Sequence, residues 1–179
     1  RRVPLLHPLE AARLGGGEAL ALDGVDVDDD GPLGAEGVAD REAEQLIRDT
    51  ILRHYPTHSL LGEEGGIHDG DKAYRWIIDP IDGTRAFASR LPVWGISVGV
   101  FHQEDAYAGV FYMPATREMY WGTNTQAFCN DRELLPRDTI DMDSPLAFMA
   151  VPSNAHQHYQ INFPRLRSLG STTAHLAYV

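Results

Sequence analysis

The chain has 179 residues with 26 acidic and 15 basic side chains, which gives a formal net charge of −11. An acidic chain repels a polyanion, so nucleic acid is not expected as a partner. The single cysteine, Cys129, excludes an intramolecular disulfide and fits a reducing compartment. No apolar run approaches the roughly 20 residues of a membrane helix. We therefore expect a cytoplasmic protein with no membrane partner and, at this length, a core of its own.

Two simple patches occupy the first forty residues. Residues 15–17 are three glycines, interpreted as a flexible linker, and residues 23–37 form an acidic stretch interpreted as a solvated loop. The run from Asp26 to Gly31 imitates the start of an EF-hand calcium loop. Its twelfth position is Gly37 instead of glutamate, so a calcium site is not expected there.

The segment from Ala39 to His54 carries apolar side chains at helical spacing, and Pro56 follows it. This pattern predicts an amphipathic helix. Asp40 lies at its predicted start, where an aspartate commonly caps the first turn. Both readings of Asp40, as a helix cap and as a functional carboxylate, remain open at this point.

Strands are predicted after the helix. The compact apolar run from Trp76 to Ile78 indicates a buried strand that Pro80 should end. Three further segments rich in β-branched and aromatic residues predict a mainly antiparallel meander at 93–101, 106–113 and 118–121.

Later in the chain we expect a strand at 146–151 and a helix over 171–179. These patterns predict a first α+β domain over residues 1–139 and the start of an α/β domain over 140–179. The tryptophans in strand-like segments are expected in the core, namely Trp76, Trp94 and Trp121.

The strongest chemical signal is the turn that follows the predicted strand, Asp79-Pro80-Ile81-Asp82-Gly83-Thr84. Two aspartates three residues apart across a proline-fixed turn can direct both carboxylates and the Ile81 carbonyl at one point. Mg²⁺ prefers such oxygen ligands, and substrate phosphate often completes its coordination. Gly83 lets the backbone approach a ligand closely, and a helix that begins at Thr84 would present free amides to a phosphate.

Glu63 and Glu64 add two carboxylates from a separate polar loop. Four acids facing inward are tolerated only where cations neutralise them, so the pattern predicts a metal site. The alternative is that the aspartates cap a turn and the glutamates are solvated. His156 and His158 have no third ligand at a suitable spacing and are expected to be solvated, and Cys129 is expected to be a buried structural thiol.

At these residues the sequence resembles the inositol monophosphatase family of magnesium-dependent, lithium-sensitive phosphatases. The resemblance runs in order from about Val38 to the end of the chain. The stretches that carry it are 38–44, 61–64, 76–84, 109–114, 127–130 and 167–174.

The resemblance implies an α/β chain with a sugar-phosphatase-like layered αβαβα fold, whose second domain is only partly present. It implies two or three Mg²⁺ ions, and Mn²⁺ suits the same oxygen ligands. The implied metal ligands are Glu63, Asp79, the carbonyl of Ile81 and Asp82. The implied catalytic residues are Asp40 and Thr84, which orient the attacking water, and Glu64, a ligand or outer partner of a further cation. The implied substrate-binding residues are Glu63, Ile81, Asp82, Gly83, Thr84, Gly170, Ser171 and Thr172.

The resemblance also implies a function: a Mg²⁺-dependent phosphomonoesterase that hydrolyses a small phosphorylated alcohol such as inositol monophosphate, in a homodimer. Residues 84–87 and 91–95 are similar to the histidinol-phosphate phosphatase branch as well, which keeps that substrate as an alternative. Members of the family use one more aspartate in a Trp-Asp motif, and the chain ends before one appears. We therefore expect a C-terminally incomplete chain, and a catalytically inactive dimerising or regulatory module is the alternative of another class.

Overall fold

The computed structural model describes residues 8–13, 15–16, 32–136 and 141–178. The long helix α2 (Pro32–His54) begins seven residues before the predicted start. Its first residue is a proline, which suits the first helical position because an amide there has no partner within the helix. Asp40 is therefore inside the helix, and its interpretation as a helix cap is wrong.

The glycine-rich patch is also more ordered than expected. Residues 8–13 and 15–16 are helical, so the linker interpretation is wrong for Gly15 and Gly16. A Cβ at Gly15 would lie 2.6 Å from the Ile47 side chain, which shows how closely this segment approaches α2. Gly17 and the EF-hand-like run Asp26 to Gly31 lie outside the described residues.

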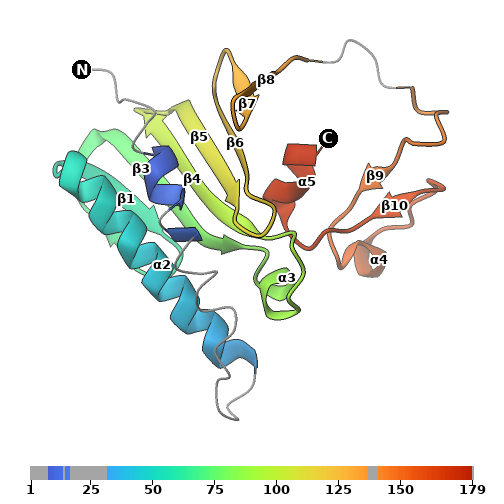
Figure 1. Cartoon of the computed structure of the whole chain (residues 1–179), viewed down its shortest axis with the longest axis horizontal. Coiled ribbons are helices and arrows are strands. Elements are labelled where there is room, and N and C mark those ends of the chain that lie inside the picture. Colours follow the sequence, from blue (N-terminus) through green and yellow to red (C-terminus); the bar gives the residue numbers. More distant parts are fainter. Residues whose placement is uncertain (1–7, 14, 17–31, 137–140, 179) are drawn as a thin grey trace.

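One eight-stranded sheet dominates the structure (Figure 1), in the order β2-β1-β3-β4-β5-β6-β7-β8. β1 is parallel to β3, and every other neighbouring pair is antiparallel, which confirms the predicted meander. The short strands β1, β2, β7 and β8 are additional to the predicted ones. The strands are β1 (His58–Gly62), β2 (Gly66–His68), β3 (Asp71–Asp82), β4 (Gly95–His102), β5 (Asp105–Met113), β6 (Glu118–Thr123), β7 (Ala127–Cys129) and β8 (Arg132–Leu134).

Pro80 does not end its strand, contrary to the prediction. β3 continues through Pro80 to Asp82, and its register with β4 shifts between Asp79 and Asp82. Proline is tolerated in a sheet where the ladder is irregular, because no amide is required there. The irregular stretch carries the two aspartates of the candidate metal turn.

The main core lies between α2 and one face of the sheet. Fully buried side chains of α2, among them Ile47 and Ile51, belong to one apolar cluster with Trp76, Ile96 and Val98. Figure 1 shows α2 lying along the sheet. Trp94 is buried and Trp121 packs against this cluster, as the sequence predicted, and Cys129 is buried.

The end of the chain folds beside this sheet. The predicted strand 146–151 is reduced to β9 (Met149–Ala150), which pairs in parallel with β10 (Leu166–Arg167). The predicted final helix is confirmed as α5 (Thr172–Tyr178). His156 and His158 lie in a short helix, α4 (Ala155–His158), and not in a loop. The predicted domain boundary at 139/140 falls outside the described residues, and no helix within the described ranges is long and apolar enough to cross a membrane.

Candidate metal and phosphate site

The candidate site lies where β1 and β3 end. These strands are parallel neighbours, so their carboxyl ends meet at the same edge of the sheet. Glu63 directly follows β1, and its amide donates a hydrogen bond to the Ile78 carbonyl over 3.3 Å. Asp79 is the next residue of β3. The fold thus brings together two carboxylates that are sixteen positions apart in the sequence.

The Asp79 carboxyl interacts with the charges of both Asp82 and Glu63. Burial, and after it the negative charges of Asp82 and Glu63, together raise the pKa of its carboxyl to about 7, against a smaller opposing effect of a hydrogen bond with the Ile81 backbone. Its Oδ1 atom is buried and has no hydrogen-bond partner. A buried, unpartnered carboxylate oxygen beside two further acids is the environment that a hard cation would stabilise. These residues therefore fit Mg²⁺.

Asp82 connects this turn to helix α5. Its Oδ2 atom accepts hydrogen bonds from the Ser171 hydroxyl over 3.1 Å and from the Thr173 amide over 2.8 Å. The Ser171 Oγ atom in turn accepts a hydrogen bond from the Ala174 amide over 2.9 Å. One carboxylate oxygen of a predicted metal ligand therefore anchors the start of α5, about ninety residues later in the chain.

The turn after Asp82 lies directly against the loop before α5. Gly83 has a φ of +100°, and a Cβ there would lie 2.9 Å from the Ser171 Cβ. Gly170 has a φ of +91°, and a Cβ there would lie 3.5 Å from the Cβ of Ala86 in α3 (Thr84–Ala88). The Thr84 hydroxyl donates a hydrogen bond to the Ile81 carbonyl over 3.3 Å. Predicted phosphate-binding and substrate-binding segments are thus side by side.

The structure does not bring all of the predicted site residues together in one buried group. Asp40 is buried, 9% exposed, on α2, which contacts α3. The side chains of Glu63, Glu64 and Thr172 are exposed. In the described part of the chain, no three histidine, cysteine or acidic side chains converge into a complete metal-binding group. The carboxylates of Asp79, Asp82 and Glu63 interact, but Asp82 Oδ2 accepts its hydrogen bonds from Ser171 and Thr173.

Glu44 was not predicted as a site residue from the sequence. This residue is on α2 and is only 1% exposed, yet it carries a carboxylate. The available signal was its position: residues 40, 43, 44, 47 and 51 form one helical face that is apolar apart from its two acids, and a buried acid on such a face needs a polar partner.

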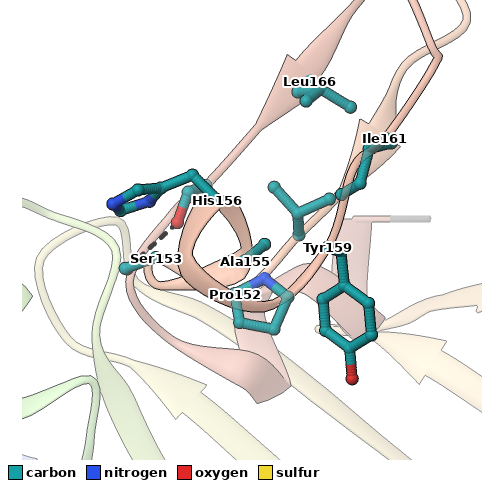
Figure 2. A pocket seen from close by; sticks show the side chains of 9 residues that line it. Pro152, Ser153, Ala155, His156, Tyr159, Ile161 and Leu166 are labelled. Atoms are coloured by element: carbon teal, nitrogen blue, oxygen red, sulfur yellow. Dashed lines mark hydrogen bonds between the residues drawn. The ribbon is translucent and has the colours of Figure 1, made fainter.

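A pocket of about 310 Å³ lies elsewhere, among β9, α4 and β10 (Figure 2). Its lining includes Pro152, His156, Tyr159 and Leu166, and contains no carboxylate and no predicted site residue. Ser153, also in the lining, shares a hydrogen bond with Ser168 over 3.1 Å. This hollow is therefore separate from the candidate metal site.

Replacing Ser171 by alanine should weaken the junction between the two segments. The variant loses the hydroxyl donor to Asp82 and the acceptor for the Ala174 amide, so we expect a loss of about 1–2 kcal/mol in the free energy of unfolding. Urea unfolding measures it. The matched control is Ser168→Ala at an exposed serine, which should change stability by less than about 0.5 kcal/mol. Equal stability of both variants would contradict the described contacts.

Comparisons with known proteins identify the family of this chain. The family model for the inositol monophosphatase family matches residues 24–179. An inositol-1-monophosphatase of Rhizobium meliloti is 33% identical over 99% of this chain and 73% of its own length. A protein of Aquifex aeolicus named fructose-1,6-bisphosphatase/inositol-1-monophosphatase is 27% identical over 87% of this chain, which spans 61% of that protein.

A solved structure supports the fold. The extragenic suppressor protein suhB from Bartonella henselae is 27% identical to this chain, with a TM-score of 0.82, over 98% of this chain and 73% of its own. This match confirms the predicted mixed α/β, sugar-phosphatase-like fold. The ordered carboxylate turn, the family match over residues 24–179 and the shared fold lead to one conclusion: the chain belongs to the inositol monophosphatase family.

Proposed function

We propose that this chain carries the metal-binding and phosphate-binding part of a Mg²⁺-dependent phosphomonoesterase that acts on a small phosphorylated alcohol. The observation that supports the proposal most is Asp79 Oδ1, buried without a partner beside Glu63 and Asp82. Such an arrangement is unfavourable in an apo protein and becomes favourable when a cation binds.

The residues that would hold the cations are Glu63, Asp79, Asp82 and the carbonyl of Ile81. The Ile81 oxygen accepts one hydrogen bond from Thr84, and a carbonyl has a second lone pair for a cation. When bound, Mg²⁺ lowers the pKa of a coordinated water and neutralises charge on the phosphoryl oxygens. Mn²⁺ would occupy the same ligands.

The remaining residues would orient the reactants. In this proposal Asp40 and Thr84 hold the attacking water, with Glu64 as an outer partner of a further cation. The backbone of Gly83 and Thr84 cradles the phosphate, and residues 170–172 contact the alcohol. The close approach of Gly83 to Ser171 supports this division, because the two segments lie in direct contact with each other.

The proposed substrate is inositol monophosphate, because two relatives carry that activity in their names. Histidinol phosphate is the second candidate, favoured by the sequence around 84–95. A cytoplasmic homodimer is part of the same proposal, and analytical ultracentrifugation tests the dimer.

The test is inorganic phosphate release from inositol 1-phosphate, histidinol phosphate, fructose 1,6-bisphosphate and an adenosine bisphosphate. We expect Mg²⁺-dependent release, fastest from inositol 1-phosphate, and a loss of about 100-fold or more in Asp82→Asn, equivalent to about 2.7 kcal/mol. The control variant is Asp131→Asn at an exposed aspartate. Unchanged release in Asp82→Asn contradicts the ligand assignment, and no Mg²⁺-dependent release from any substrate favours the inactive module.

A further inference from the structure

One buried side chain on α2 forms hydrogen bonds with the backbone of the loop that carries Glu63 and Glu64. Glu44 on α2 accepts a hydrogen bond from the Glu64 amide at Oε2 over 2.8 Å and one from the Gly65 amide at Oε1 over 2.9 Å. At 1% exposure, this carboxylate has almost no contact with water. Both of its oxygens are therefore directed at the backbone of one loop.

Arg48 completes the same arrangement one helical turn later. It forms an ion pair with Glu44 Oε1 over 3.0 Å and donates a second hydrogen bond from the same nitrogen to the Gly66 carbonyl over 3.1 Å. The pair on α2 thus contacts both donors and an acceptor of the loop backbone. The buried Glu44 carboxylate is tolerated here because the Arg48 guanidinium and two backbone amides compensate its charge.

The fit between Glu44 and the loop leaves no spare room. A Cβ at Gly62 would collide with the Glu44 carboxylate, and one at Gly65 would lie 2.6 Å from its Oε1 atom. Glycines flank the two glutamates for this reason, since any larger residue would displace the carboxylate or the loop.

We propose that Glu44 is a positioning residue that fixes the loop in the conformation from which Glu63 reaches a cation together with Asp79 and Asp82. The inference rests on the proposed function of that site. Its physical basis is that two hydrogen bonds to consecutive amides fix the peptide planes on both sides of Glu64. The hydrogen bonds to Glu44 then help to fix the loop backbone from which the Glu63 side chain extends.

The test compares Glu44→Gln with Glu42→Gln, an exposed glutamate two residues earlier on the same helix. Glutamine keeps the length of the side chain but replaces one acceptor oxygen by an NH₂ group that cannot accept a hydrogen bond. Two quantities are measured on the full chain: amide hydrogen exchange at Glu64 and Gly65 without metal, and the Mn²⁺ dissociation constant from electron paramagnetic resonance.

In Glu44→Gln we expect about tenfold faster exchange at one or both amides, and Mn²⁺ binding weaker by about tenfold or more. Glu42→Gln should match the unchanged chain in both. A role in stability alone would lower the denaturation temperature and leave the Mn²⁺ dissociation constant of the folded protein unaltered, which would overturn the proposal.

Gly65→Ala is a second route to the same displacement, because it keeps the Glu44 charge and moves the loop. It should reproduce the weaker Mn²⁺ binding even if Glu44→Gln fails to fold, and normal binding in it would also overturn the proposal. If the unchanged chain binds no Mn²⁺, the proposed metal site itself fails and this inference fails with it. If the unchanged chain binds Mn²⁺ and both variants bind it equally well, only the role of Glu44 is wrong.

Discussion

Asp79→Asn should abolish Mn²⁺-dependent stabilisation and at the same time make the metal-free chain more stable at pH 8. The pKa of Asp79 is about 7 in the folded chain against 3.8 as its ordinary value. Between these two values the folded state binds more protons than the unfolded state, so stability falls as pH rises from about 4 to about 7. Above that window the full penalty remains, because the carboxylate is ionised in both states.

Asparagine has no charge and so avoids this penalty. Since Asp79 is only partly buried, solvent screening reduces the effect, and we expect a gain of about 1–3 kcal/mol at pH 8 with EDTA and little gain at pH 4. Urea unfolding at the two pH values measures this gain, and Asp131→Asn is the control. A metal-free Asp79→Asn chain that is less stable than the unchanged chain at pH 8 would contradict the described environment.

Gly83→Ala is expected to cause the second large effect. A φ of +100° is unfavourable for any residue with a Cβ, and the added atom would press on the Ser171 Cβ at 2.9 Å. Strain and overpacking together should lower the free energy of unfolding by about 2–4 kcal/mol. The turn and α5 should separate, so the Thr173 amide, which donates to Asp82, should exchange faster.

The matched control is Gly99→Ala on β4. Its φ is not positive, and the nearest atom to an added Cβ, on Phe101, is 3.8 Å away. Thermal unfolding and hydrogen exchange on both variants check the expectation. Similar losses of stability in Gly83→Ala and Gly99→Ala would contradict the described strain and close packing at Gly83.

The part of the candidate site that could be predicted from the sequence is the part that local sequence patterns determine. Asp79 and Asp82 were found because a strand and a turn determine both positions within a few residues. The hydrogen bonds from Ser171 and Thr173 to Asp82 span about ninety residues, and the ones from the Glu64 and Gly65 amides to Glu44 span about twenty. Contacts at such separations depend on how elements pack, which periodicity does not encode.

The fold shows the same limit. The helix and the long strands were predicted because their apolar periods extend over many residues, whereas β2, β7 and β8 have three residues each and too short a pattern to identify. Pro80 was expected to end β3, but the register shift opposite β4 removes the need for its amide. Pro32 begins α2 within a segment whose acidic composition indicated a loop.

The most direct test of the metal site is anomalous scattering from Mn²⁺ in crystals of the chain grown with MnCl₂ and phosphate. We expect a peak bounded by Glu63, Asp79, Asp82 and the Ile81 carbonyl, with phosphate density toward Gly83 and Ser171, and no such peak in Asp79→Asn crystals. An anomalous peak only at other residues, with Asp79 Oδ1 still unliganded at saturating Mn²⁺, would contradict the proposed metal site.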